Sequence, residues 1–491
     1  MKKILKKDFY LISGITFILL LLVHIPLMTK NIITADGLLN NYYYNGYSWE
    51  LSLGRFGLYL IGILKSFISI PHLELILSYL IISLITYLLI KLFNVEDKIN
   101  KVFIILFMVL SPIISANLVF AYCSVPYLLA FFLSILSIYL FEQLKNKYLK
   151  TIIPIILMVI SLSMYQAYLS LIITVFMLYT LKKIFDKEFD YKLFINYLVM
   201  ILISIITYFI SMKLSQIVFH INMADYSNAS SIGINTILTI PSKIIDSYKL
   251  TYNFLFTDQF MKNIYMHNNI INLLLVIIFI VSIVLNTIKN KLETKDIIKV
   301  ALIIILLPIF LNSVIFVISD TKLQLLMSSS YLLLPIYLFS ILDRKYIKLA
   351  TIIISILLLR NYSIQVQSTY LTLENTFNTY HTVINEAINR NIDSPNNKYI
   401  IIGKYEKTSP LINNISKSNY GYISDEDLFW DEHNLRKIAF ERFVNEYFGL
   451  DLEYATEEEY NEITFIYNDR TIKTIDNIVI INFNNYNKLK K

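Results

Sequence analysis

Long apolar runs separated by short polar segments fill about the first three quarters of the chain. A run of about 20 apolar residues is long enough to cross the hydrocarbon core of a bilayer as a helix. The pattern therefore predicts a series of membrane-spanning helices. We expect these helices at residues 9–28, 75–93, 102–120, 126–141, 193–213, 268–288, 300–319, 323–342 and 346–360.

Residues 151–181 form an uncharged apolar run that is too long for one span and short for two. The flanking segments 142–150 and 182–192 are both rich in Lys, which is typical of cytoplasmic loops. Two cytoplasmic ends require an even number of crossings, so we expect a helical hairpin that turns near Tyr165-Gln166. With this hairpin the chain has about eleven membrane segments and a cytoplasmic N-terminus.

The segments expected on the opposite side of the membrane contain few Lys and Arg for their length. They are the first outer loop, residues 29–72, a large outer loop, residues 214–267, and two short segments, residues 121–125 and 320–322. The sequence thus predicts an α-helical polytopic membrane domain over residues 1–361. The more polar residues 362–491 then form a small extracytoplasmic α/β domain.

The C-terminal domain shows both helical and strand patterns. We expect helices near 366–391 and 433–447, and strands at 398–403, 463–467 and 477–483. No glycine-rich phosphate loop follows any of these strands, so nothing in this part of the sequence indicates a nucleotide site.

Composition supports a membrane protein and excludes several other classes. The chain has 491 residues, of which 56% are hydrophobic and 16% charged, whereas about a quarter of a typical soluble domain is charged. The formal net charge of +7 lies in Lys clusters between apolar runs, which indicates orientation signals and not a nucleic-acid partner. Cys123 is the only cysteine, and the six His lack zinc-site spacing, so we expect no disulfide, metal or other cofactor.

Asp36 is the acidic residue that follows the first predicted span, in the sequence TADG. A carboxylate at the membrane interface is well placed to take a proton from an acceptor hydroxyl, and partial desolvation would make it a stronger base. The alternative is that Asp36 caps a short helix over LLNNYYY. The spacing alone does not decide between these roles.

Arg55 lies in SLGRFGLYLIG between Gly54 and Gly57, where a lipid or a backbone segment can approach closely. Its guanidinium is suited to bidentate binding of a phosphate, although an interfacial Arg can also simply contact lipid headgroups. Lys322 and Arg360 are further cations expected on the same side, each with the same alternative. Lys65, His72 and Glu74 follow Arg55 and could line one groove, with Glu74 at the membrane interface.

Aromatic and amide side chains are the remaining candidates. Tyr165 and Gln166 form the predicted hairpin apex, where polar groups should be buried in protein or line a cavity. Tyr127 lies in a short outer turn, and Trp49 belongs to an aromatic run in the first outer loop. Aromatic rings are common at membrane interfaces, but they also stack on sugars.

Three short motifs carry a family resemblance. They are the run Trp49-Glu50-Leu51-Ser52-Leu53-Gly54-Arg55-Phe56, the turn SVPYLLAF (124–131) and the apex MYQAYLS (164–170), all after an early acidic residue. Together they resemble the bacterial GtrII-type glucosyltransferase family, whose members are similar to the GT-C glycosyltransferases. The resemblance covers about residues 9–361.

The resemblance implies that the protein transfers a hexose, typically glucose, from a polyprenyl-phosphate carrier to a cell-surface glycan. It implies a multi-pass protein of the bacterial plasma membrane, with membrane lipids as partners and no nucleic acid. Asp36 matches the position of the family's base, although Gly37 stands where family members often have a second acid. Arg55, Lys322 and Arg360 would bind the donor phosphate, and Trp49, Tyr127, Tyr165 and Gln166 would line the donor or acceptor groove.

Three other functions are compatible with parts of the pattern. A flippase for lipid-linked glycans would place ionisable residues inside its spans and often shows internal repeats, whereas this sequence has almost no charge at predicted mid-membrane positions and no internal repeats. An O-antigen-polymerase-like or protein-mannosyltransferase-like enzyme would use the same side of the membrane with another donor or acceptor. A membrane anchor for the C-terminal domain would leave the first outer loop unexplained.

Overall fold

The computed structural model describes residues 2–40, 48–224, 239–257, 268–317, 323–405, 428–466 and 472–484. These residues divide into two compact units. The first, which we name the helical unit, comprises Met1–His24 and the described residues of Tyr42–Val366. The second, the C-terminal unit, comprises Ile25–Asn41 together with the described residues from Gln367 onward. Segments from both ends of the chain therefore contribute to the C-terminal unit.

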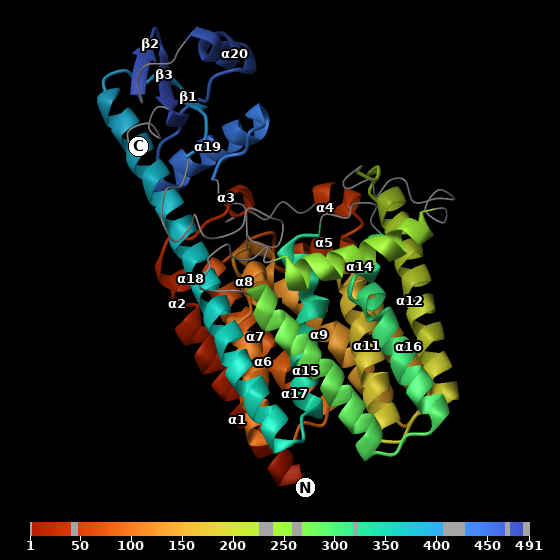
Figure 1. Cartoon of the computed structure of the whole chain (residues 1–491). Coiled ribbons are helices and arrows are strands. Elements are labelled where there is room, and N and C mark those ends of the chain that lie inside the picture. The colour runs from red at the N-terminus through yellow and green to blue at the C-terminus, as the bar shows by residue number, and fades with distance from the viewer. Residues whose placement is uncertain are drawn as a thin grey trace. The chain divides into compact units, whose positions relative to one another are not determined.

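The helical unit is a bundle of long apolar helices that lie side by side (Figure 1). Seven helices in the described part of the chain are long and apolar enough to cross a membrane. They are α6 (Pro71–Leu92), α9 (Ala121–Gln143), α10 (Lys147–Met164), α11 (Tyr168–Phe185), α12 (Tyr191–Val218), α15 (Asn268–Lys289) and α18 (Lys345–Arg390). The bent pair α7 (Lys98–Leu110) and α8 (Pro112–Leu118) forms an eighth span if the two are counted together. The chain is thus a multi-pass membrane protein.

Buried serine pairs join the central helices of the bundle. Helix α9 packs against α6, α10 and α11. The Oγ atoms of Ser78 and Ser124 lie 2.8 Å apart between α6 and α9, and those of Ser134 and Ser161 lie 2.8 Å apart between α9 and α10. Small residues let apolar helices approach closely, and their hydroxyls find partners across the interface instead of lipid.

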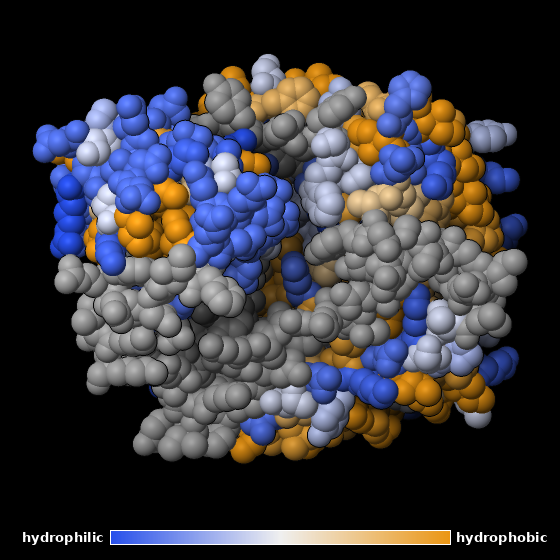
Figure 2. Space-filling model, turned by 90° about the horizontal axis from the view of Figure 1, so that it is seen from above, coloured by the Kyte–Doolittle hydropathy of each residue, from blue (hydrophilic) through white to orange (hydrophobic). Residues whose placement is uncertain are grey.

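The outer helices expose apolar faces, as expected for contact with lipid. Many large apolar side chains of α12 and α15 are exposed, and Figure 2 shows apolar surface along the edge of the helical unit. Helix α11, by contrast, is buried over most of its length. Since lipid tails are as apolar as these side chains, such exposure is stable in a bilayer but not in water.

The predicted break at Tyr165-Gln166 is confirmed. Helix α10 ends at Met164 and α11 begins at Tyr168, and each helix is long enough to cross a membrane. The backbone of Tyr165 is extended, with φ of −156° and ψ of 105°. An extended residue interrupts the helical hydrogen bonds, so one charge-free run forms two helices.

The prediction of about eleven spans is not confirmed. Helices α1 (Lys2–Val23) and α16 (Thr294–Leu311) begin with several charged residues, so neither is apolar over enough length. Residues 323–342 are divided between the 3₁₀-helix η3 (Leu325–Leu332) and the short helix α17 (Leu333–Ile341). A short helix η2 (Ser313–Phe316) precedes them.

Three shorter helices lie at one end of the bundle, which we name the α5 end. They are α4 (Ser48–Ser52), α5 (Phe56–Leu64) and α14 (Ile240–Phe256). The N-terminus lies at the opposite end, which we name the N-terminal end (Figure 1). Helix α14 packs against α15 and α16, so part of the predicted large outer loop is helical.

The C-terminal unit contains a three-stranded sheet with the order β1-β3-β2. Strand β1 (Lys398–Ile402) pairs in parallel with β3 (Ile478–Asn482), and β2 (Ile472–Ile475) pairs with β3 in the antiparallel direction. The strands predicted at 398–403 and 477–483 and the helix near 433–447 (α19, His433–Phe448) are confirmed. Helix α18 continues through the predicted helix near 366–391 and into this unit.

The strand predicted at 463–467 is wrong over its described part, because helix α20 covers Glu457–Ile466. A capping box starts this helix. The backbone N–H of Thr456 donates to Glu459 Oε2 at 2.8 Å, and the N–H of Glu459 donates to Thr456 Oγ1 at 3.3 Å. Reciprocal capping and three acidic residues in the first turn favour the helix over the strand preference of ITFI.

Candidate functional site

The Gly54-Arg55 turn connects α4 to α5 and places the Arg55 side chain. Gly54 has a φ of +78°, a left-handed conformation that favours glycine. A Cβ atom at Gly54 would lie 2.6 Å from Met212 Sδ and 2.9 Å from Tyr208 Oη, both on α12. The turn therefore requires glycine both for its conformation and for its close contact with α12.

Arg55 is held by three side chains, which come from α4, from α9 and from the α10–α11 break. Its Nη1 lies 3.4 Å from Glu50 Oε2 and donates to Tyr127 Oη at 3.1 Å. Its guanidinium carbon lies 5.3 Å from the centre of the Tyr165 ring. The exposed fractions of the Arg55 and Glu50 side chains are 15% and 10%. The charge is thus largely enclosed.

Gln166 ties the α10–α11 break to the same turn. Its Nε2 donates to the Leu53 carbonyl at 2.7 Å and to Tyr208 Oη at 2.9 Å. The Tyr208 hydroxyl lies 3.2 Å from the Gly54 carbonyl and donates to it. These bonds satisfy backbone carbonyls that the turn leaves without helical partners. Gln166 therefore holds the turn that presents Arg55.

We name these residues the Arg55 cluster. It contains Glu50, Gly54, Arg55, Tyr127, Tyr165, Gln166 and Tyr208. The Tyr127 and Tyr165 rings stack with centres 4.4 Å apart, which gives the cluster an aromatic wall beside its cation. A planar cation beside aromatic faces can bind an anionic group and an apolar or sugar ring together.

The structure brings together four of the residues singled out in the sequence: Arg55, Tyr127, Tyr165 and Gln166. Trp49 precedes Glu50 in α4, and its side chain is 53% exposed. Arg360 has an exposed side chain on α18. Lys322 lies outside the described residues.

Sequence reasoning missed Tyr208 and assigned no role to Glu50. Tyr208 lies in the middle of the long apolar helix α12, where one Tyr among 37 gives no distinguishing signal. Glu50 could have been found as the carboxylate five residues before Arg55, because a partly buried cation at a membrane interface needs an opposite charge nearby.

A second polar group lies where α5 meets α6. Lys65 Nζ pairs with Glu74 Oε1 at 2.5 Å and donates to the Tyr122 carbonyl at 3.3 Å. Ser69 Oγ donates to the same Glu74 oxygen at 3.0 Å. Glu74 is only 4% exposed and lies in the first turn of α6, so it is a buried partner of Lys65, and its place at the membrane interface stays a prediction.

Asp36 belongs to the C-terminal unit, in the short helix α3 (Ala35–Asn40). The cap of this helix is Thr34, whose Oγ1 accepts the Gly37 N–H at 2.9 Å. Asp36 lies in the first turn with a half-buried side chain, and its carbonyl accepts the Asn40 amide at 2.9 Å. The capping role considered for Asp36 is therefore filled by Thr34.

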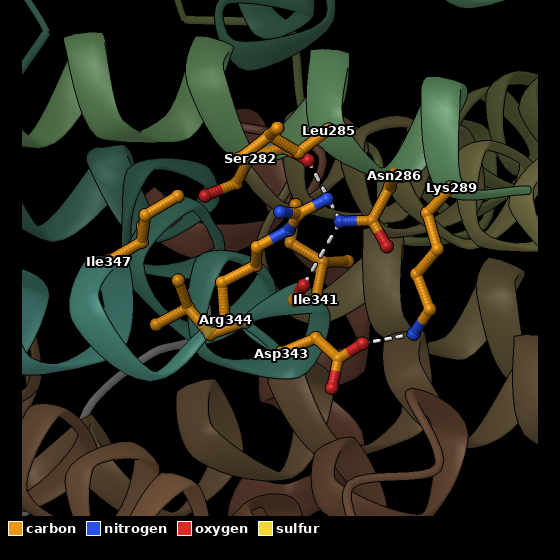
Figure 3. Close-up of a pocket in the computed structure, with 9 residues that line it drawn as sticks. Ser282, Leu285, Asn286, Lys289, Ile341, Asp343, Arg344 and Ile347 are labelled. Atoms are coloured by element: carbon orange, nitrogen blue, oxygen red, sulfur yellow. Dashed lines mark hydrogen bonds and ion pairs between the residues drawn. The ribbon is translucent and has the colours of Figure 1, made fainter.

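A polar pocket lies at the N-terminal end of the helical unit (Figure 3). Its volume is about 20 Å³, room for about one water. The Asn286 amide donates to the carbonyls of Ser282 and Ile341 at 2.8 and 3.1 Å. Lys289 pairs with Asp343 beside it, and a larger cavity of about 240 Å³ adjoins these residues. These contacts join the end of α15 to the α17–α18 turn, so their role is structural.

The fold and the site define a multi-pass membrane protein with an enclosed Arg-aromatic cluster at one end of its helical bundle. A family model described as "Glucosyl transferase GtrII" matches residues 25–339. Since this match covers more than half of the chain, the protein belongs to the GtrII glucosyltransferase family. No curated protein and no solved structure matches the chain.

Proposed function

We propose that this protein transfers a hexose, most simply glucose, from a polyprenyl-phosphate donor to a glycan acceptor outside the bacterial cell membrane. The observation that carries the proposal is the family membership, because the matched residues 25–339 include every member of the Arg55 cluster. This proposal includes the donor class, the acceptor class, the GT-C-like architecture, the cytoplasmic N-terminus and the outer C-terminal domain.

Arg55 is the proposed ligand of the donor phosphate. A polyprenyl-phosphate sugar stays in the bilayer, so its phosphate must meet a cation at membrane level. Arg55 lies beside α5 at one end of the membrane helices, with its guanidinium enclosed by Glu50, Tyr127 and Tyr165. Fixed donors that face a developing phosphate charge stabilise the transition state. Lys322 and Arg360 are weaker candidates for the same role.

Asp36 is the proposed base. Its carboxylate takes the proton of an acceptor hydroxyl while the acceptor oxygen bonds to the anomeric carbon of the donor sugar. The bond from that carbon to the phosphate oxygen breaks, and polyprenyl phosphate leaves with the bonding electron pair. A half-buried carboxylate suits this step, because it is reachable by a hydroxyl yet less hydrated than an exposed one.

The test is sugar transfer in membranes that contain equal amounts of each variant and labelled polyprenyl-phosphate glucose. We expect the wild type to release polyprenyl phosphate. Asp36→Asn should lower the rate by at least 100-fold, a typical contribution of a general base. The control is Asp393→Asn, which removes an exposed carboxylate of the same unit. Equal rates for Asp36→Asn and Asp393→Asn would exclude Asp36 as the base.

A further inference from the structure

The short segment that carries Asp36 folds with residues more than 300 positions later in the chain. Ile25–Asn41 belong to the same compact unit as the residues from Gln367 onward. Helix α3 packs against α19. The conformation of α3 therefore depends on the C-terminal residues, since a helix of six residues is too short to be stable by itself.

Leu38 anchors α3 in the hydrophobic core of the C-terminal unit. It is fully buried and belongs to one cluster with residues of α18, α19 and the sheet. Ala35, also buried, lies one turn earlier on the same face. Because successive helical residues are about 100° apart, Asp36 points away from this buried face. The packing of Leu38 thus decides which face of α3 is buried and on which side Asp36 lies.

Two polar contacts complete the attachment. The Arg442 guanidinium on α19 donates to the Leu39 carbonyl, one of the last carbonyls of α3. Lys30 Nζ pairs with Glu374 Oε2 on α18 at 2.7 Å. The first contact satisfies a carbonyl that a helix end leaves without an intrahelical partner. The second fixes the chain before α3.

Glu446 is placed to affect the first contact, because it lies one helical turn after Arg442. Burial raises the pKa of Glu446 to about 7, against the lowering effect of Arg442. A carboxyl that is partly protonated near neutral pH attracts the guanidinium less than a full charge would.

We propose that the C-terminal unit is a positioning domain for Asp36, and that Arg442 is a positioning residue for the transfer reaction. This inference rests on the proposed role of Asp36 and extends it to a domain whose role the sequence leaves open. The proposal predicts that a substitution that weakens the α3–α19 contact slows sugar transfer, although the substituted residue does not contact the donor.

The experiment compares Arg442→Ala, Arg442→Lys and Lys437→Ala in the full-length protein. Lys437 is the matched control, because its Nζ lies 3.8 Å from Glu441 of the same helix. Hydrogen exchange of residues 34–40 and the kinetics of sugar transfer are both measured. Exchange in β1 and β3 serves as the check that the C-terminal unit is folded.

For Arg442→Ala we expect roughly five-fold faster exchange in residues 34–40, the effect of one lost hydrogen bond. We expect kcat to fall roughly ten-fold or more with an unchanged donor KM, because a misplaced base slows the chemical step. Arg442→Lys should recover part of both losses, and Lys437→Ala should behave as the wild type. Unchanged exchange in Arg442→Ala, or faster exchange with wild-type kcat, would overturn the proposal.

A charge exchange gives a second test if Arg442→Ala fails to fold. Lys30→Glu should speed exchange in residues 34–40 and lower kcat, and Lys30→Glu combined with Glu374→Lys should restore both. Failure of the pair to restore kcat would contradict the positioning role. If Asp36→Asn transfers sugar like the wild type while exchange still responds to these variants, the proposed base is wrong and the positioning role falls with it.

Discussion

The Arg55 cluster and the ion pairs at the N-terminal end of the helical unit both join a cation to a carboxylate, but they hold their charges differently. The Arg55 and Glu50 side chains are 15% and 10% exposed. Tyr127 and Tyr165 contact the Arg55 guanidinium, and Gln166 bonds to the turn that carries it. The Lys289 and Asp343 side chains at the other end are 55% and 57% exposed. Water screens the second pair and largely not the first.

This difference in burial distinguishes a candidate functional site from ion pairs that only hold helix ends together. A largely buried charge is costly unless its partners remain in place, so a protein keeps such a cluster where the charge has a use. An exposed pair costs little and contributes little. The polar pocket in Figure 3 is therefore weak evidence for a ligand site, although it lies beside the larger cavity.

The largest effect should come from Arg55→Met, which removes the cation but keeps much of its volume. Glu50 then carries a charge that is 90% enclosed without its partner, and we expect a loss of about 3 kcal/mol in the free energy of unfolding. The unfolding midpoint in detergent measures this loss. Sugar transfer should also be abolished if Arg55 binds the donor phosphate.

The double variant Arg55→Met with Glu50→Gln provides the control for that prediction. Removing the second charge should restore much of the stability but none of the transfer activity. If the double variant is as unstable as Arg55→Met, packing of the guanidinium and not its charge stabilises the turn. The charge of Arg55 would then contribute as little to stability as the exposed ion pair at the N-terminal end.

A smaller effect is expected from Gly57→Ala, which tests how closely α5 approaches α10. A Cβ atom at Gly57 would lie 3.0 Å from the Ser163 backbone carbon and closer still to Ser163 Oγ. Such overpacking costs about 1–3 kcal/mol. Gly14→Ala in α1 is the control, because nothing lies within 4 Å of its added Cβ. A wild-type unfolding midpoint for Gly57→Ala would contradict the close contact at this end.

The sequence predicted the parts of this arrangement that local pattern determines. The break at Tyr165-Gln166 follows from two Lys-rich flanks, and the strands β1 and β3 follow from their apolar runs. The packing of α3 on α19 could not be predicted, since the Leu39–Arg442 contact joins residues about 400 positions apart. Helix α20 was missed because its capping box competes with β-branched residues that favour strands.

The smallest effect should come from the N-terminal end, where Asp97→Asn tests an ion pair whose Asp97 side chain is 47% exposed and whose Lys348 side chain is 16% exposed. Lys348 Nζ lies 2.5 Å from Asp97 Oδ1, which also caps α7 by accepting the Asn100 N–H at 3.0 Å. The ion pair and the capping bond lower the pKa of Asp97. Asn can keep the cap, so the variant removes the charge and retains the helix start.

The sign of the pH effect follows from the lowered pKa of Asp97. The folded protein holds this proton less tightly than the unfolded chain, so the stabilisation is present above the unfolded pKa of about 3.9 and is lost as pH falls through the folded pKa. At pH 7 Asp97→Asn should be less stable by less than about 1 kcal/mol, and the difference should vanish at low pH and shrink in high salt. Unfolding midpoints at several pH values and salt concentrations measure it. A large, salt-independent loss of stability would show that the N-terminal end also holds an enclosed charge. Burial of an ion pair would then no longer distinguish the Arg55 cluster, as a candidate functional site, from ion pairs that only hold helix ends together.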